Sequence, residues 1–540
     1  MDTISEAATF QGFSDFPIIV SILAQSFNLQ KPIYLSNLMR LCNALANKDS
    51  MTPLLSSGLP GTKFNMAVMG DGFAAGDDQN IYNNKVKDLL IHGVFNNDFF
   101  LSQKSAFNIY RVNLISQDSG VGTKTYDNNG NLISTVTKNT ALGIYYNGDW
   151  DHCWLEDGPN TGNLIDNALN KWVPDYNIVL IFVNCPGGGG CTINGRPTVP
   201  LGIAWDTIAH ELGHGIGGLG DEYCAQDDTH GVYTGPEPNK VNITINTNKA
   251  TLKWKGYVDS ITPIPTGIGK CVSYNQGTKP NDWDDNQSVG LFEGGGTYNN
   301  GIYRPVIDCR MNSNSPPFCP VCYAQMESIT RNHMGTESAQ NASEQIKTPD
   351  VLQEKSVPPL MEETVQKPKD NSIDPNSSDG YVRFKIHMEN GKPSITDVKE
   401  VPGQLIAPKT VNLGYNYEVL TDDKLITLGF LPDVGVRRSF ANRDVPGREG
   451  KHHITILPSF DFFVRVPKNQ ISEKTLSQMT IMVHDVKQAP YRLLKEVPLT
   501  KQTDFMSIEI GRMVGIKMDE IPKEVSSQLN RILKENEEIK

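Results

Sequence analysis

The segment from Thr207 to Cys224, TIAHELGHGIGGLGDEYC, carries two histidines four residues apart with a glutamate between them. On an α-helix, residues i and i+4 lie on one face, so His210 and His214 can present imidazole nitrogens to a single metal ion. Glu211 lies about 100° further round the helix and can reach a water molecule at an open position of that ion. Zinc lowers the pKa of such a water to about 7, and the glutamate can take its proton and pass it to a leaving amine. The pattern therefore predicts a hydrolytic zinc site on a helix.

The residues that follow favour this metal site over the alternative, a core helix whose histidines bind backbone groups. Gly217, Gly218 and Gly220 can adopt positive φ, so the chain can turn back toward the metal. Asp221 and Glu222 come next, and either carboxylate can complete a set of three protein ligands. We expect Asp221 to be the ligand, because its short side chain suits a site reached by a tight turn.

The helix that positions these groups has an apolar side made of Trp205, Ile208, Leu212 and Ile216, and Asp206 is its expected N-cap. It follows an alternating series of strands and helices whose strands read FNMAVM, FNIYRVNLIS and DYNIVLIFVN. The last is a nearly continuous apolar run, typical of a strand buried on both faces. This order predicts an α/β catalytic domain.

At 540 residues the chain is too long for one ordinary domain, and its composition changes along its length. After the catalytic domain comes a stretch rich in Pro, Glu, Lys and Ser, which is typical of a flexible linker. Beyond it apolar residues recur at every second position, as in YVRFKIHM, which is typical of β-strands. Asn390–Gly391 is a hairpin signal. The predicted parts are a helical N-terminal segment (1–55), the catalytic domain (56–335), the linker (336–379), an all-β sandwich (380–520) and a C-terminal helix (521–540).

Composition argues against some classes of partner. The net charge of −12 disfavours nucleic acid and anionic membranes, and no apolar run approaches the ~20 residues that span a bilayer. The N-terminal run FPIIVSILA follows acidic residues, so it is a poor signal peptide.

Eight of the nine cysteines lie between Cys153 and Cys322, which indicates disulfides or metal sites in that region. Disulfides form in oxidising compartments, so we expect an extracellular or periplasmic protein. Cys185 and Cys191 bracket PGGGG and are expected to close a small loop.

Three further cysteines, Cys309, Cys319 and Cys322, surround Met311 in YRPVIDCRMNSNSPPFCPVC. The CPVC spacing fits a structural zinc site with Cys271 as the fourth ligand, and the same residues fit a disulfide that fixes this loop. The disulfide is the preferred interpretation.

The segment HELGHGIGGLGDEY resembles the bacterial IgA-specific metalloendopeptidase family, in the Met-turn branch of zinc peptidases. The resemblance extends over roughly residues 60–330 and includes MAVMGDGF, NTALGIYY and VGLFEGGGTYNNGIYRPVIDCRMN. It implies a zinc endopeptidase in which Met311 forms an apolar floor beneath the metal. Most Met-turn peptidases carry the third ligand six residues after the second histidine, which here is Gly220, so Asp221 is the expected substitute.

The sequence therefore predicts a zinc-dependent endopeptidase with one catalytic Zn²⁺ and a protein or peptide substrate, for which the family name suggests immunoglobulin A. The β-sandwich is expected to contact a substrate, a glycan or a surface. The alternative is a catalytically inactive binding or adhesion protein on a peptidase-like scaffold, and a zinc amidase would share the same residues. The intact set of His210, Glu211, His214 and Asp221 favours an active enzyme over an inactive descendant.

Overall fold

The computed structural model describes residues 48–538 except 128, 149–152, 188, 225–230, 269–278, 314, 335–379, 404, 407 and 441–453. The predicted linker, nearly all of the predicted N-terminal helical segment and Cys271 lie outside the described residues.

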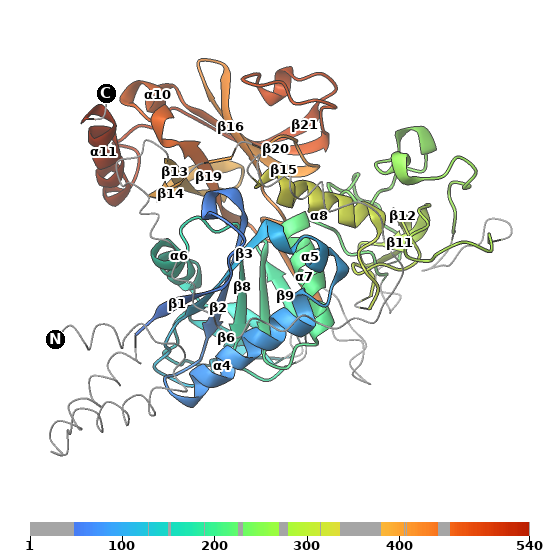
Figure 1. Cartoon of the computed structure of the whole chain (residues 1–540), viewed down its shortest axis with the longest axis horizontal. Coiled ribbons are helices and arrows are strands. Elements are labelled where there is room, and N and C mark those ends of the chain that lie inside the picture. Colours follow the sequence, from blue (N-terminus) through green and yellow to red (C-terminus); the bar gives the residue numbers. More distant parts are fainter. Residues whose placement is uncertain are drawn as a thin grey trace.

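The first part of the chain folds around a mixed eight-stranded sheet (Figure 1). Its strands, in spatial order, are β1 (Ser50–Leu55), β3 (Phe107–Asn113), β2 (Phe64–Asp71), β8 (Ile178–Val183), β10 (Arg196–Pro200), β9 (Gly190–Ile193), β17 (Val436–Phe440) and β18 (Ile454–Ile456). The four strands β3, β2, β8 and β10 run parallel, and the outer strands pair antiparallel. Every residue of β2 and β8 is buried, which accounts for their nearly continuous apolar sequences.

Helices and a small second sheet cover the two faces of this sheet. Alternate residues of β2, namely Phe64, Met66 and Val68, share a core with α4 (Asp77–Asp88), the π-helical turn η2 (Leu89–Val94), α5 (Asp98–Ser102), α7 (Trp205–Gly217) and α8 (Pro320–Asn332). Ala67 and Met69 point to the opposite face. There they pack with α6 (Thr161–Trp172) and with β6 (Ile144–Tyr146) and β7 (Leu155–Asp157). These two strands belong to a four-stranded sheet of order β5 (Leu132–Val136), β4 (Gly122–Tyr126), β6, β7.

Two segments that carry the family resemblance meet at the end of β2. Asp71, in MAVMGDGF, accepts hydrogen bonds from the backbone N–H groups of Leu142 and Ile144, in NTALGIYY, at 2.8 Å each. This fully buried carboxylate therefore has a structural role, because it ties the loop before β6 to the central strand.

The helical conformation predicted for the last residues of the N-terminal segment is wrong. Residues Ser50–Leu55 form strand β1 at the edge of the sheet, where they pair antiparallel with β3. Pro53 lacks the N–H that a helix interior requires, whereas an edge strand tolerates proline.

The C-terminal part contains two further antiparallel sheets. One has the order β14 (Lys392–Pro402), β13 (Gly380–Glu389), β19 (Ser459–Pro467), and the other β16 (Lys424–Phe430), β15 (Gly414–Thr421), β20 (Thr480–Gln488), β21 (Met506–Val514). Side chains of both sheets and of α11 (Lys523–Glu538) share one core. At the β13–β14 turn, Asn390 and Gly391 have φ of 50° and 76°, as a tight hairpin requires.

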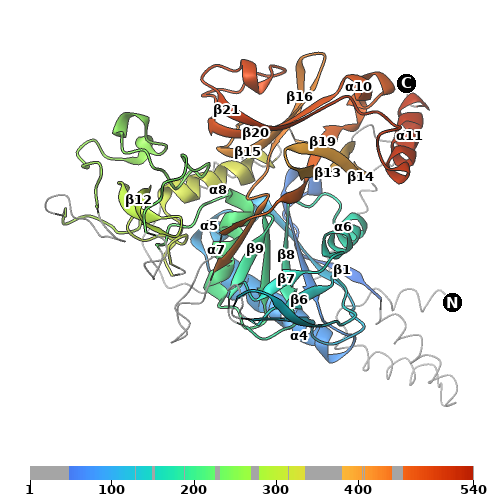
Figure 2. The same ribbon diagram turned by 180° about the vertical axis from the view of Figure 1, so that it is seen from behind.

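The strands β17 and β18 leave these two sheets and extend the eight-stranded sheet instead. β17 pairs antiparallel with β9, so that Arg438 lies opposite Thr192. Figure 2 shows the C-terminal part above the sheet and its strands reaching down beside β9. The predicted sandwich region is therefore interlocked with the preceding region.

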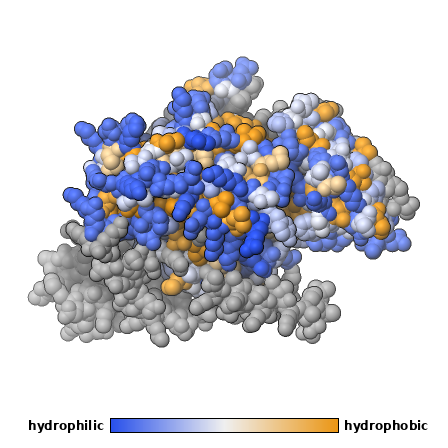
Figure 3. Space-filling view, turned by 90° about the horizontal axis from the view of Figure 1, so that it is seen from above, coloured by the Kyte–Doolittle hydropathy of each residue, from blue (hydrophilic) through white to orange (hydrophobic). Residues whose placement is uncertain are grey.

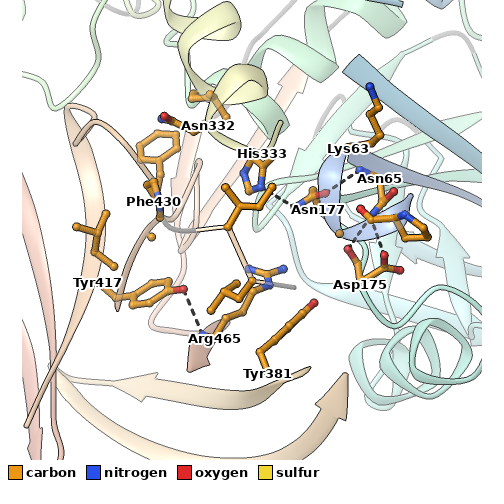
Figure 4. A pocket seen from close by; sticks show the side chains of 18 of the residues that line it. Lys63, Asn65, Asp175, Asn177, Asn332, His333, Tyr381, Tyr417, Phe430 and Arg465 are labelled. Atoms are coloured by element: carbon orange, nitrogen blue, oxygen red, sulfur yellow. Dashed lines mark hydrogen bonds between the residues drawn. The ribbon is translucent and has the colours of Figure 1, made fainter. Parts of the chain in front are cut away.

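A pocket marks the contact between the two parts (Figure 4). On one side, Asn177 and His333 are hydrogen-bonded at 3.2 Å; on the other, the backbone N–H of Arg465 donates to the Tyr417 hydroxyl at 3.2 Å. The Arg465 guanidinium also donates to the Tyr176 carbonyl at 3.0 Å across the contact. These bonds hold the C-terminal part, and with it β17, in a fixed position against the sheet.

None of the helices that the structure describes is long and apolar enough to cross a bilayer. On the face in Figure 3, hydrophilic residues alternate with small groups of hydrophobic ones. Single exposed apolar side chains are ordinary on folded proteins, so no docking surface is inferred from this face.

Candidate active site

The helix α7 begins at Trp205, one residue before Asp206, which the sequence predicted as its N-cap. Ala204 is the N-cap and makes no side-chain cap hydrogen bond, so the assignment of Asp206 as N-cap is wrong. Asp206 lies in the first turn, where a carboxylate interacts favourably with the helix dipole. Ile208, Leu212 and Ile216 form the buried apolar side, as their spacing predicts.

The glycines at the end of α7 have two different functions. Gly218 is the C-cap, with φ of 58°, and its N–H binds the His214 carbonyl at 2.9 Å. Gly217 and Gly220 do not adopt positive φ; a Cβ there would lie 2.8 Å from the Met326 sulfur and 2.5 Å from Ile243, respectively. Close packing therefore explains two of the three glycines, contrary to the expectation that all three serve the turn.

Three ligand atoms form a nearly equilateral triangle. His210 Nε2 lies 3.1 Å from His214 Nε2, and Asp221 Oδ1 lies 3.3 Å and 3.2 Å from these two nitrogens. In a tetrahedral zinc site with bonds of about 2.0–2.1 Å, neighbouring ligand atoms are about 3.3–3.4 Å apart. The triangle therefore fits three ligands of a single zinc ion.

Backbone carbonyls orient both imidazoles toward this triangle. His210 Nδ1 donates to the Arg310 carbonyl at 2.9 Å, and His214 Nδ1 donates to the Leu219 carbonyl at 2.8 Å. Because these bonds place the ring protons on Nδ1, each Nε2 keeps a lone pair for a metal.

Glu211 lies beside the triangle with one oxygen held and the other free. Its Oε2 accepts a hydrogen bond from the Thr192 hydroxyl at 2.6 Å, whereas Oε1 is buried without a hydrogen-bond partner among the described residues. Burial raises the pKa of Glu211 to about 7, against the opposing effects of His214 and Thr192. An unpaired buried oxygen requires a partner such as water, which is what a general base in this position would bind.

Asp221 and Glu222, the two candidates for the third metal ligand, lie in different clusters. Asp221 joins the two histidines, whereas Glu222 joins Cys309, Cys319 and Cys322. Asn242 separates them, because its amide donates to the Gly220 carbonyl and to Glu222 Oε1, both at 2.8 Å.

The turn that carries Met311 packs directly under α7. A Cβ on Gly213 would lie 2.6 Å from the Met311 sulfur, and the Met311 carbonyl accepts a hydrogen bond from the Glu222 N–H at 2.7 Å. Met311 is fully buried. The three cysteines around this turn are buried free thiols, so the disulfide preferred from the sequence is wrong.

The pairing of Cys191 differs from the expected one. Cys191 forms a disulfide with Cys153, and Cys185 is a buried free thiol. Cys153 and Cys191 lie in the same core with a Cα–Cα distance of 5.2 Å, so spatial proximity rather than sequence proximity decides the pair.

Arg438 of β17 reaches this site from the C-terminal part. Its Nη1 lies 2.9 Å from Asp221 Oδ2, and its Nε lies 2.8 Å from Asp433, which also pairs with Lys240 at 2.6 Å. Burial opposes ionisation of Asp433, but Arg438 and Lys240 outweigh it and hold the pKa of that carboxyl far below its usual value. Arg438 thus holds the Asp221 oxygen that points away from the histidines. Local sequence could not identify this arginine, which lies 217 residues from its partner.

Arg438→Met is expected to weaken metal binding by about 10–100-fold, because outer partners of metal ligands typically contribute this much. Competition titration against a chromogenic chelator measures the affinity. Arg437→Ala is the matched control, since Arg437 donates to the Leu155 carbonyl instead. Equal affinities in the two variants would contradict a positioning role for Arg438.

The chain was compared with known protein families. Residues 52–282 match the model of a peptidase family, which supports a peptidase, and the family implies a metal-dependent one. The family is described as IgA Peptidase M64, and the match over this region supports the resemblance seen in the sequence. The match includes α7 and Asp221 and ends before Met311 and β17. A search of curated proteins gave no match.

Proposed function

We propose that this chain is a zinc-dependent endopeptidase that hydrolyses peptide bonds in protein substrates. His210, His214 and Asp221 are the proposed zinc ligands and Glu211 the general base. The triangle of ligand atoms, with sides of 3.1–3.3 Å, carries the proposal.

Each residue of the site has its own role in the proposed mechanism. Bound zinc supplies Lewis-acid polarisation of the scissile carbonyl and a lowered pKa for water. Glu211 Oε1 takes the proton of the attacking water and delivers it to the leaving amine, while Thr192 fixes the other carboxylate oxygen. Arg438 fixes Asp221 from behind, and Tyr223 stacks on the His210 ring with a centroid distance of 6.2 Å.

A metzincin-like catalytic domain followed by a β-sandwich is the architecture that we propose. Met311 beneath α7 supports the first part, since its sulfur packs against the helix between the two histidines. The core shared by the two C-terminal sheets supports the second. The predicted domain boundaries need one addition, because β17 and β18 belong to the larger sheet.

An extracellular or periplasmic location and immunoglobulin A as substrate remain proposals. The Cys153–Cys191 disulfide supports an oxidising compartment. The name of the matched family is the support for IgA. The rival, an inactive binding protein, is disfavoured because the ligand triangle and the oriented Glu211 are both intact.

Removing the metal tests the catalytic proposal. Dialysis against a strong chelator is expected to lower hydrolysis of an unfolded protein such as casein by about 100-fold or more, because a metal contributes several kcal/mol to transition-state stabilisation. Added Zn²⁺ should restore the rate in the wild type and not in His214→Ala. Undiminished hydrolysis after complete zinc removal would contradict the proposal.

The IgA proposal has a separate readout. Purified IgA incubated with the wild type should yield new fragments on a denaturing gel that Glu211→Gln does not produce. Casein cleavage without IgA cleavage would retain the endopeptidase and reject this substrate.

A further inference from the structure

A second cluster of metal-binding side chains lies beside the candidate active site. Glu222, Cys309, Cys319 and Cys322 each offer one ligand atom, and these four atoms all lie within 4.8 Å of one another. All four residues have no exposed surface, and none of the three cysteines forms a disulfide.

Three separate chain segments build this cluster. Cys319 is the N-cap of α8 and Cys322 lies in its first turn, so the CPVC spacing turns both thiols to one side. Cys309 begins the turn that carries Met311, and Glu222 follows directly after Asp221. Packing of α8 against α7 brings these segments together (Figure 1).

The hydrogen bonds within the cluster leave it incompletely satisfied. The Cys322 thiol contacts Glu222 Oε1 at 3.1 Å, and the side chains of Cys309, Cys319 and Cys322 contact one another. Glu222 Oε2 is buried and has no hydrogen-bond partner among the described residues. Three thiols and a carboxyl group in an apolar core are poor partners for each other, because a thiol is only a weak donor and acceptor.

We propose that these four residues bind a second, structural zinc ion. Three thiolates and one carboxylate suit this borderline-soft ion, and tetrahedral ligands at Zn–S bonds of about 2.3 Å lie about 3.8 Å apart. This separation is compatible with four ligand atoms that all lie within 4.8 Å of one another. Three features offset the negative charge: the Cys319 N–H donates to the Cys309 sulfur at 3.3 Å, the N-terminus of α8 points at the thiolates, and Asn242 donates to Glu222.

This ion would stabilise the chain segments that position the catalytic ligands. Its ligands Glu222 and Cys309 are the chain neighbours of Asp221, a proposed catalytic ligand, and of Arg310, whose carbonyl orients His210. The Glu222 N–H also binds the Met311 carbonyl at 2.7 Å, which ties these two segments together. Adjacent residues of the chain thus serve two different ions.

Zinc counting tests the proposal on the full chain, purified in reducing buffer without chelator. We expect two zinc ions per chain in the wild type, one in His214→Ala and one in Cys322→Ser. Cys185→Ser, which alters a buried free thiol outside both clusters, should keep two. A wild type with a single zinc that His214→Ala loses would overturn the second site and leave the catalytic proposal intact. Zinc retained in full by His214→Ala and lost from Cys322→Ser would support the cysteine site and reject the catalytic one.

Cobalt gives a measurement that does not require the cysteine variant to fold. Co²⁺-loaded His214→Ala should show an intense near-ultraviolet band from thiolate-to-cobalt charge transfer. Absence of this band, or a Cys309–Cys319 disulfide found by peptide mapping of the wild type, would overturn the proposal.

Discussion

Replacing Glu211 by glutamine is expected to lower the rate of peptide-bond hydrolysis by about 10²–10⁴-fold, the usual contribution of a general base. Glutamine keeps the size of the side chain and can still accept the hydrogen bond from Thr192. It cannot take a proton from water at the position of Oε1. Metal affinity should change little, because Glu211 is not one of the three atoms of the ligand triangle.

The measurement is kcat/KM on a fluorogenic peptide, together with zinc content of the same samples. Glu327→Gln makes the same chemical change at a partly exposed position of α8, where Glu327 pairs with Arg331 at 2.8 Å, and should retain the wild-type rate. A Glu211→Gln variant that keeps its zinc and more than a tenth of wild-type activity would show that another group is the base.

Replacing Asp221 by alanine is expected to remove the catalytic ion. The variant loses the only carboxylate oxygen that lies 3.2–3.3 Å from both histidine nitrogens among the described residues. It also brings the Arg438 charge, now paired with Asp433 alone, next to the ion. Both effects oppose a divalent cation, so affinity should fall by more than the 10–100-fold expected for outer partners.

Competition with a chromogenic chelator measures this loss, with Asp206→Ala as control because that carboxylate lies half-exposed on the same helix. Zinc content of the same samples should fall from two ions per chain to one in Asp221→Ala, so that the ion proposed at the cysteine cluster is accounted for. Unchanged zinc affinity in Asp221→Ala would transfer the role of third ligand to another residue.

The local pattern of the sequence was sufficient for the elements themselves. The i, i+4 spacing of the histidines and the apolar positions of α7 follow from the helical period, which a few consecutive residues establish. The buried runs that became β2 and β8 and the Asn390–Gly391 turn are equally local signals. The failure at β1 has a physical reason too: an edge strand is held by its pairing with β3, and this partner is not visible in six residues of sequence.

By itself, then, the sequence determined a region, residues 52–282, that matches the IgA-peptidase family, and one helix that carries two histidines and a glutamate on suitable faces. Only the tertiary structure decided three further points. Asp221 is the carboxylate that lies with the two histidines, Arg438 holds this carboxylate in place, and Glu222 lies with the cysteines instead. The contacts join residues that are far apart in the sequence: 11 positions for His210 and Asp221, 217 for Arg438 and Asp221, and 100 for Cys322 and Glu222. The neighbouring carboxylates Asp221 and Glu222 are nearly equivalent as sequence letters, but the segment that carries them places their side chains in different clusters. Packing of α8 and β17 on either side of that segment then gives each of them its own partners.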